Sequence, residues 1–103
     1  MGEFVKVANL TDVPLGTGQQ VSAGGRVVAL FNVNGVIHAM HGTCTHRGGP
    51  LGEGQLQDGV VTCPWHGARF EVSTGKVLGP PAPQGVAVYK VVVEEDAIKV
   101  ELP

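Results

Sequence analysis

Two short motifs each combine a cysteine with a histidine, the side chains that bind soft transition metals. The first is Cys44-Thr45-His46 and the second is Cys63-Pro64-Trp65-His66, with sixteen residues between His46 and Cys63. Each motif places a thiolate and an imidazole on one tight loop, and these ligand types suit zinc and iron–sulfur clusters. Asp58-Gly59 lies between the motifs and is a strong hairpin signal. We therefore expect the chain to fold back there and to bring the two loops side by side.

Four converging ligands of two kinds are compatible with two metal sites. One is a tetrahedral Cys₂His₂ zinc site. The other is a binuclear [2Fe-2S] cluster in which one iron takes both thiolates and the other takes both imidazoles. Structural zinc sites more often use C-x₂₋₄-C pairs with a separate histidine pair, which favours the cluster. A zinc-stabilised interaction module with no redox role remains the alternative.

The segments that must position these loops have the pattern of β-strands. Helical periodicity is absent over any useful length, whereas short runs of alternating apolar residues recur. The predicted strands are 4–10, 27–33, 36–40, 60–62, 86–94 and 98–102. Asn34-Gly35 and, more weakly, Glu95-Asp96 indicate further hairpin turns. Asp12 is the one expected N-cap, for at most a single helical turn, and the sequence therefore predicts an all-β fold.

Length and composition indicate one domain spanning 1–103. Sixteen glycines and seven prolines accompany a charged fraction of only 16%, which suits a turn-rich β fold. Between about 42 and 83 the composition shifts toward Gly, Pro, Cys and His, while the flanking segments carry the regular strands. We interpret 42–83 as a site-bearing insert on a β scaffold.

Charge and hydropathy argue against several kinds of partner. The formal net charge is −2 and Lys and Arg form no basic run, so neither nucleic acid nor an acidic membrane surface is expected as a partner. No apolar stretch approaches the length of a membrane helix, and the first ten residues have neither a basic leader nor an apolar signal core. We expect a cytoplasmic protein.

Both motifs resemble a known family. CTHRGG (44–49) and CPWHG (63–67) are similar to the paired ligand loops of Rieske proteins and Rieske-type ferredoxins. Gly79-Pro80-Pro81 is similar to the proline loop that covers the cluster in that family. The resemblance covers nearly the whole chain and implies a Rieske-like antiparallel β sandwich with a small cluster-binding subdomain.

The same resemblance implies the ligand set. Each chain would hold one [2Fe-2S] cluster, with Cys44 and Cys63 on the inner iron and His46 and His66 on the outer iron that gains the electron. His38 and His41 match no ligand of the family, and we expect neither to bind the cluster.

Departures from the respiratory branch of the family bear on the reduction potential. Gly49 and Trp65 stand where the respiratory proteins have two cysteines joined in a disulfide. Ala68 and Phe70 stand where they have a Ser and a Tyr whose hydroxyls donate to cluster sulfurs. Fewer donors to sulfur leave the reduced state less stabilised. We expect a potential near the low end of the Rieske range of about −150 to +300 mV.

Other loop residues have expected roles around the cluster. Backbone N–H groups of Gly48, Gly49, Gly67 and Ala68 are expected to point at the sulfides, since glycines allow a close approach. Trp65 is expected to shield the cluster and to add apolar contact area for a partner. The arginines that flank the two motifs, Arg47 and Arg69, are candidates for attracting an acidic patch on a redox partner.

The function that the resemblance implies is electron transfer. The chain is similar to the ferredoxin component of bacterial aromatic-ring-hydroxylating dioxygenase systems, which accepts electrons from a flavin-containing NAD(P)H reductase and passes them to a terminal oxygenase. Such a chain is an electron carrier in aromatic hydrocarbon catabolism and not itself an enzyme. No nucleophile–base pair indicates hydrolysis, and Glu53 and Glu71 have no acid/base partner. The alternative within the family is the Rieske-like small subunit of an assimilatory nitrite reductase.

Overall fold

Eleven strands and two short 3₁₀ turns make up the described part of the chain. The computed structural model describes residues 3–43, 49–65, 67–79 and 84–102. The strands are β1 (Glu3–Asn9), β2 (Gly18–Ala23), β3 (Arg26–Val33), β4 (Val36–His41), β5 (Gln55–Gln57), β6 (Val60–Thr62), β7 (Arg69–Glu71), β8 (Val77–Gly79), β9 (Val88–Tyr89), β10 (Val91–Glu94) and β11 (Ala97–Leu102). The 3₁₀ turns are η1 (Leu10–Asp12) and η2 (Leu51–Glu53).

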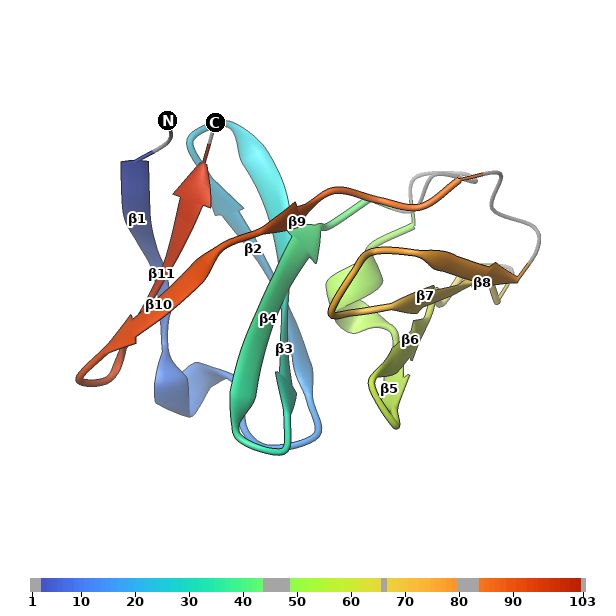
Figure 1. Cartoon of the computed structure of the whole chain (residues 1–103), viewed down its shortest axis with the longest axis horizontal. Coiled ribbons are helices and arrows are strands. Elements are labelled where there is room, and N and C mark those ends of the chain that lie inside the picture. The colour runs from blue at the N-terminus through green and yellow to red at the C-terminus, as the bar shows by residue number, and fades with distance from the viewer. Residues whose placement is uncertain (1–2, 44–48, 66, 80–83, 103) are drawn as a thin grey trace.

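These strands form three sheets in which every strand pair is antiparallel (Figure 1). The outer sheet has the order β1-β11-β10, the central sheet β2-β3-β4-β9, and the insert sheet β5-β6-β7-β8. Figure 1 shows the central sheet between the other two, with both termini at the outer-sheet end. The predicted all-β sandwich with a small additional subdomain is confirmed.

Strand β3 separates two hydrophobic cores, because successive side chains of a strand point to opposite faces. Val28 and Leu30 lie in the core shared with the outer sheet, whereas Ala29 and Phe31 lie in the core shared with the insert sheet. All four are fully buried. Burial on both faces explains why this strand is a continuous apolar run and not an alternating one.

Each core draws on elements far apart in the sequence. The outer core consists of Val13, Val28, Leu30, Ile37, Ala39, Ile98, Val100 and Leu102. The inner core consists of Ala29, Phe31, Met40, Leu51, Val61, Cys63, Ala68, Phe70 and Val72. The insert sheet is therefore attached to the central sheet through a packed apolar layer that contains one of the candidate metal ligands, Cys63.

The predicted hairpin turns have the backbone geometry that their residues favour. Asn34 and Gly35 have φ of 54° and 92°, and Asp58 and Gly59 have φ of 52° and 77°. Two central residues with positive φ define a type I′ turn, which matches the twist of the strands it joins. Glu95, with φ 54°, lies in the two-residue connection between β10 and β11. All three predicted hairpins are confirmed.

The single strand predicted for 86–94 was wrong. Val88–Tyr89 pairs with β4, whereas Val91–Glu94 pairs with β11, so the chain moves from the central sheet to the outer sheet at Lys90. Alternation of apolar residues records which side of a strand is buried but carries no information about the strand's partner.

The expected helical turn also differs from the structure. Asp12 does not begin a helix but ends η1, whose N-cap is Asn9. Its carboxylate Oδ2 accepts a hydrogen bond from the Asn9 N–H at 2.9 Å. An acidic residue at the third helical position can accept a hydrogen bond from the backbone N–H of the N-cap residue, as in a capping box. The helical turn therefore lies before Asp12, one turn earlier in the chain than expected.

Four strands had no sequence prediction. β2 contains Gln19 and Gln20, and β5, β7 and β8 are three residues each. None of these four segments has a run of alternating apolar residues, and they are strands because neighbouring strands supply their hydrogen-bond partners.

Candidate metal centre

The second motif lies on a closed loop between β6 and β7. The Cys63 N–H donates to the Ala68 carbonyl oxygen at 2.7 Å, which extends the antiparallel pairing of Thr62 with Arg69. The Gly67 N–H donates to the Cys63 carbonyl oxygen at 3.3 Å, and Gly67 has φ 77°, which glycine adopts without strain. The strand pair therefore holds the loop 63–68 at its base. His66, a predicted ligand, lies outside the described residues.

Cys63 is buried in the inner core with only 2% of its surface exposed. Its Sγ accepts a hydrogen bond from the Trp65 N–H at 3.4 Å. A backbone N–H aimed at sulfur stabilises negative charge there, which suits a thiolate ligand. Sequence reasoning missed this donor, although the two-residue spacing is one at which side chains often accept from local backbone N–H groups.

The Gly67 N–H was expected to point at a cluster sulfide. In the structure it donates instead to the Cys63 carbonyl oxygen. Gly48 lies outside the described residues.

The first motif is also on a loop that is closed at its base. Thr43 and Pro50 form an antiparallel bridge, and the Leu51 N–H donates to the Gly42 carbonyl oxygen at 2.9 Å. Both predicted ligands of this motif, Cys44 and His46, lie outside the described residues, as do Arg47 and Gly48.

The two loops meet at Gly49, as expected from the sequence. A Cβ on Gly49 would stand 2.6 Å from Cys63 Sγ and 3.1 Å from Trp65 Cγ. Real Cβ atoms essentially never stand 2.6 Å from another heavy atom, so glycine is needed for the first loop to approach the sulfur of the second so closely. Gly49, three residues after His46 in the sequence, is therefore in contact with the cysteine of the second motif.

Residues that the sequence placed around the centre have distinct surroundings. Ala68 and Phe70 are fully buried, and neither carries a hydroxyl. Trp65 is 49% exposed, which places an apolar ring both beside Cys63 and at the surface. Arg69 is exposed at the start of β7.

Among the described residues, neither of the other two histidines lies in a group of potential metal ligands. His38 and His41 lie in β4 opposite Phe31 and Val28, and the His41 N–H donates to the Ala87 carbonyl oxygen at 2.8 Å. Within residues 3–43, 49–65, 67–79 and 84–102, no three His, Cys, Asp or Glu side chains gather into a potential metal site.

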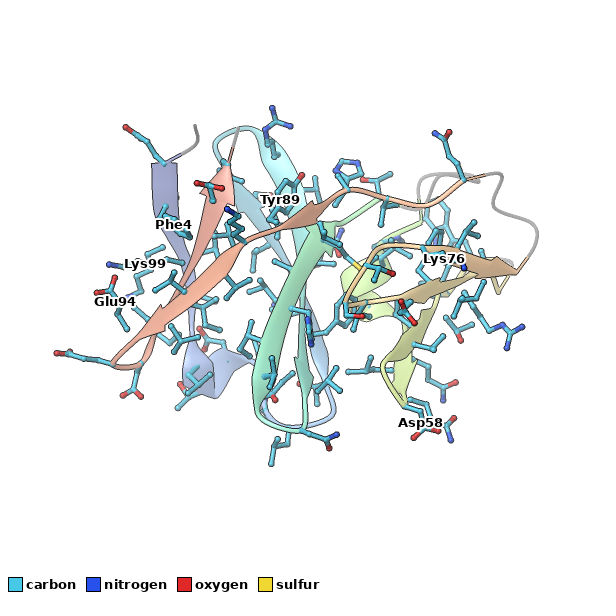
Figure 2. The ribbon with its side chains drawn as sticks, viewed as in Figure 1. Phe4, Asp58, Lys76, Tyr89, Glu94 and Lys99 are labelled. Atoms are coloured by element: carbon cyan, nitrogen blue, oxygen red, sulfur yellow. The ribbon has the colours of Figure 1, made fainter. Side chains whose placement is uncertain are left out.

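The ion pair in the described part of the chain lies far from the candidate metal centre. It joins Lys99 Nζ to Glu94 Oε1 at 2.9 Å. Figure 2 shows both on the outer sheet, at the opposite end of the molecule from Lys76 and the insert sheet. Among the described residues, Cys63 lies within the apolar inner core and its Sγ accepts the Trp65 N–H.

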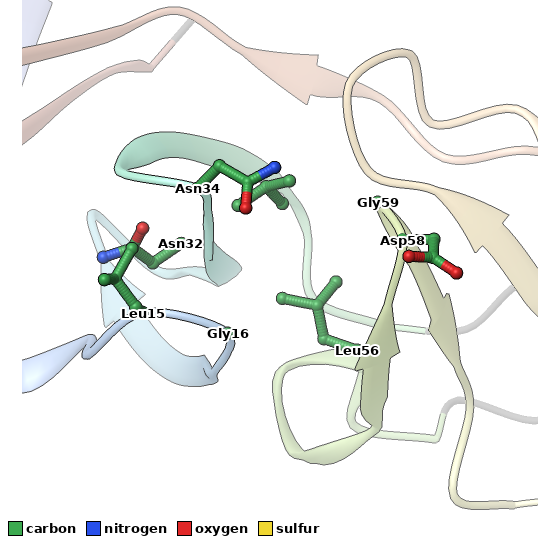
Figure 3. Close-up of a pocket in the computed structure, with 8 residues that line it drawn as sticks. Leu15, Gly16, Asn32, Asn34, Leu56, Asp58 and Gly59 are labelled. Atoms are coloured by element: carbon green, nitrogen blue, oxygen red, sulfur yellow. The ribbon is translucent and has the colours of Figure 1, made fainter.

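A groove of about 610 Å³ lies at the other end of the insert sheet. It runs between the β3–β4 turn at Asn34 and the β5–β6 turn at Asp58, with Leu15 and Leu56 on its walls (Figure 3). Gly59 precedes β6 and Cys63 follows it, so the groove and the metal centre lie at opposite ends of that strand. The groove is not part of the centre.

Comparison with known proteins agrees with this geometry. Residues 3–90 match the model of the Rieske [2Fe-2S] domain. This chain belongs to the Rieske [2Fe-2S] family. It is 41% identical over 92 residues to the biphenyl dioxygenase ferredoxin subunit of a Pseudomonas species, covering 88% of this chain and 84% of that protein. It is 32% identical over 100 residues to the ferredoxin component of the naphthalene 1,2-dioxygenase system of Pseudomonas putida, covering 97% and 96%.

A solved structure shows the same fold in a ferredoxin. The ferredoxin in a complex of reduced oxygenase and oxidised ferredoxin of carbazole 1,9a-dioxygenase superposes with a TM-score of 0.87 at 33% identity, covering 95% of this chain and 92% of that one. The Rieske chain described here is accordingly a [2Fe-2S] electron carrier of the ferredoxin type and not a catalytic component.

The residues present fit such a cluster. Cys63 offers a buried sulfur with a backbone donor, and Gly49 leaves open the space beside it. Cysteine and histidine form the donor set that a Rieske centre requires.

In the described part of the chain, no helix is long and apolar enough to cross a membrane.

Proposed function

We propose that this chain holds one [2Fe-2S] cluster through Cys44, His46, Cys63 and His66. It carries single electrons from a flavin-containing NAD(P)H reductase to the terminal oxygenase of an aromatic-ring dioxygenase system. We place this activity in the cytoplasm, where thiolate ligands stay reduced.

The observation that carries the proposal is the contact between the two motif loops. Each loop is closed by antiparallel backbone hydrogen bonds, and Gly49 of the first loop abuts Cys63 of the second. Because each loop contributes one cysteine and one histidine, this arrangement supports a centre built from both. We propose that 42–83 is the cluster-binding part of a single domain spanning 1–103.

Protein groups around Cys63 set the conditions for electron transfer. When bound, the cluster takes up and releases one electron at a time. Cys63 is buried in the inner core with 2% of its surface exposed, and the Trp65 N–H donates to its sulfur. A buried, preorganised setting reduces the rearrangement of solvent and protein that accompanies a change of charge. Ala68 and Phe70 offer no hydroxyl to the sulfurs, which supports a low potential.

Partner docking is supported by the surface beside the second loop and by the relatives. Trp65 and Arg69 are exposed there, and aromatic and arginine side chains are enriched at the energetic centres of interfaces. The carbazole dioxygenase ferredoxin was solved together with its oxygenase. The reductase as electron donor follows from the resemblance to ferredoxin components of dioxygenase systems.

The first experiment is metal analysis with visible and low-temperature EPR spectroscopy of purified protein before and after dithionite. We expect two irons per chain, a colour that bleaches on reduction, and a rhombic EPR signal with average g below that of an all-cysteine cluster. Stoichiometric zinc in a colourless, EPR-silent protein would overturn the proposal.

Ligand assignment is tested by single substitutions. Cys44→Ala, His46→Ala, Cys63→Ala and His66→Ala are each expected to abolish the Rieske signal, since each removes one of the four donor atoms that the cluster needs. His38→Ala and His41→Ala are the matched controls and should keep two irons. A Rieske signal that survives in any of the four ligand variants would remove that residue from the ligand set.

A further inference from the structure

Gln20 makes two hydrogen bonds to the segment that carries the first ligand loop. It lies on β2, at the edge of the central sheet, 22 residues before Gly42 and 32 residues before Gly52. Its Nε2 donates to the Gly42 carbonyl oxygen at 2.7 Å, and its Oε1 accepts from the Gly52 N–H at 2.6 Å. One side-chain amide thus joins the backbone just before the loop to the backbone just after it.

This arrangement needs glycine at both contact points. A Cβ on Gly42 would stand 2.7 Å from Gln20 Nε2, and a Cβ on Gly52 would stand 2.5 Å from Gln20 Oε1. Both distances are shorter than any real Cβ contact, so a side chain at either position would displace the amide. Both donor and acceptor of Gln20 are used, and the residue is partly buried, which strengthens hydrogen bonds relative to those in open water.

Backbone hydrogen bonds also close the first ligand loop at its base. The Thr43–Pro50 bridge and the Leu51 N–H to Gly42 carbonyl bond hold the two ends of the loop to each other. The Gly42 end is also held to the central sheet, because it directly follows β4 and its N–H donates to the Val27 carbonyl oxygen of β3 at 2.9 Å. Gln20 adds a side-chain hydrogen bond from each end of the loop to β2, which is paired along its whole length with β3, the strand that both cores enclose.

We propose that Gln20 is a positioning residue for the cluster, acting through the first ligand loop. By joining Gly42 and Gly52 to β2, it restricts the movement of the first ligand loop relative to Cys63. The inference rests on the proposed ligand set, and it assigns a role to a residue that contributes no ligand atom.

Gln20→Met tests the proposal, because methionine has nearly the same length and shape but neither the amide donor nor the carbonyl acceptor. Gln19→Met is the matched control, since Gln19 is the exposed neighbour on the same strand. Measurements on the iron-loaded proteins are the rate of iron release to a chelator, the midpoint potential, and hydrogen exchange in a peptide covering 50–54. We expect about tenfold faster iron release and lost protection at Gly52 in Gln20→Met, and wild-type behaviour in Gln19→Met.

Gln20→Glu separates the two bonds of the amide. A carboxylate still accepts from the Gly52 N–H but cannot donate to the Gly42 carbonyl oxygen. Protection at Gly52 should therefore be kept, while iron release is still faster than in wild type. Loss of packing alone would not produce this split between the two variants.

Failure of this inference is distinguishable from failure of the proposed function. Wild-type protein without a Rieske signal would overturn the proposed function. A wild-type Rieske signal together with equal iron release, potential and Gly52 exchange in Gln20→Met and Gln19→Met would overturn only the role of Gln20. If Gln20→Met does not fold, absence of Gly52 protection in folded wild-type protein overturns the role, and its presence together with the Gln20→Glu result supports it.

Discussion

Gly49 lies so close to Cys63 that a Cβ on Gly49 would stand 2.6 Å from the cysteine Sγ. The same Cβ would be 3.2 Å from the Cβ of Trp65. The contact joins the two loops that carry the cysteine–histidine motifs. Residues of both loops therefore line the space beside the Cys63 sulfur.

Gly49→Ala is expected to impair cluster binding. Its new methyl group must displace either Cys63 Sγ or the first loop, and overpacking of a filled site costs about 1–3 kcal/mol. Iron content per chain should fall, as measured by metal analysis and EPR. Gly59→Ala is the control, because it strains a turn with φ 77° but meets no atom within 4 Å. Equal iron content in the two variants would contradict the prediction.

Trp65→Ala is expected to weaken docking to the oxygenase without changing the centre's potential. Trp65 is 49% exposed beside the second loop, and an interface tryptophan typically contributes about 2 kcal/mol or more when it is buried by a partner. The KM for the ferredoxin in oxygenase turnover should rise roughly tenfold or more. Val36→Ala serves as control, since Val36 is 57% exposed at the distant β3–β4 turn. An unchanged KM in Trp65→Ala would rule out a docking role.

Ala68→Ser is expected to raise the midpoint potential. It restores a hydroxyl at the position where the respiratory branch of the family has one, and a donor to sulfur favours the more negative, reduced state. A bond stronger by about 1 kcal/mol in the reduced state shifts a one-electron potential by roughly 40 mV. Potentiometric titration followed by EPR measures the shift. Ala39→Ser places the same hydroxyl in the outer core and should leave the potential unchanged; a shift of equal size there would refute the explanation.

Gly75→Ala is expected to destabilise the attachment of the insert sheet. Gly75 has φ 77°, and a Cβ there would overlap the Val86 carbonyl oxygen. The Val86 N–H donates to the Gly75 carbonyl oxygen at 2.8 Å, so the two segments are in close contact. Gly16→Ala has the same φ but no atom within 4 Å, so it isolates the backbone strain of about 1–2 kcal/mol. The melting temperature measured by circular dichroism should fall further in Gly75→Ala than in Gly16→Ala. Equal falls would mean that the close approach to Val86 is unimportant for stability.

Local chemistry in the sequence was enough to predict several features. The Asn34-Gly35 and Asp58-Gly59 pairs predict type I′ hairpins because Asn, Asp and Gly adopt positive φ at a lower cost than other residues. The Cys-x-His and Cys-x-x-His spacings predict paired ligand loops because each motif fits on one turn of chain. The all-β class followed from short runs of alternating apolar residues, and the side-by-side loops followed from the Asp58-Gly59 hairpin. The family followed from the resemblance of CTHRGG (44–49) and CPWHG (63–67) to Rieske ligand loops.

Only the tertiary structure decided features that depend on partners distant in the chain. The division of 86–94 at Lys90 follows from pairing with β4 on one side and β11 on the other. The hydrogen bonds of Gln20 span 22 and 32 residues, and nothing in the neighbouring sequence marks that glutamine as different from Gln19. Periodicity and turn propensity depend on neighbouring residues in the sequence. Strand pairing and the hydrogen bonds of Gln20 depend on which distant segments the fold places beside them.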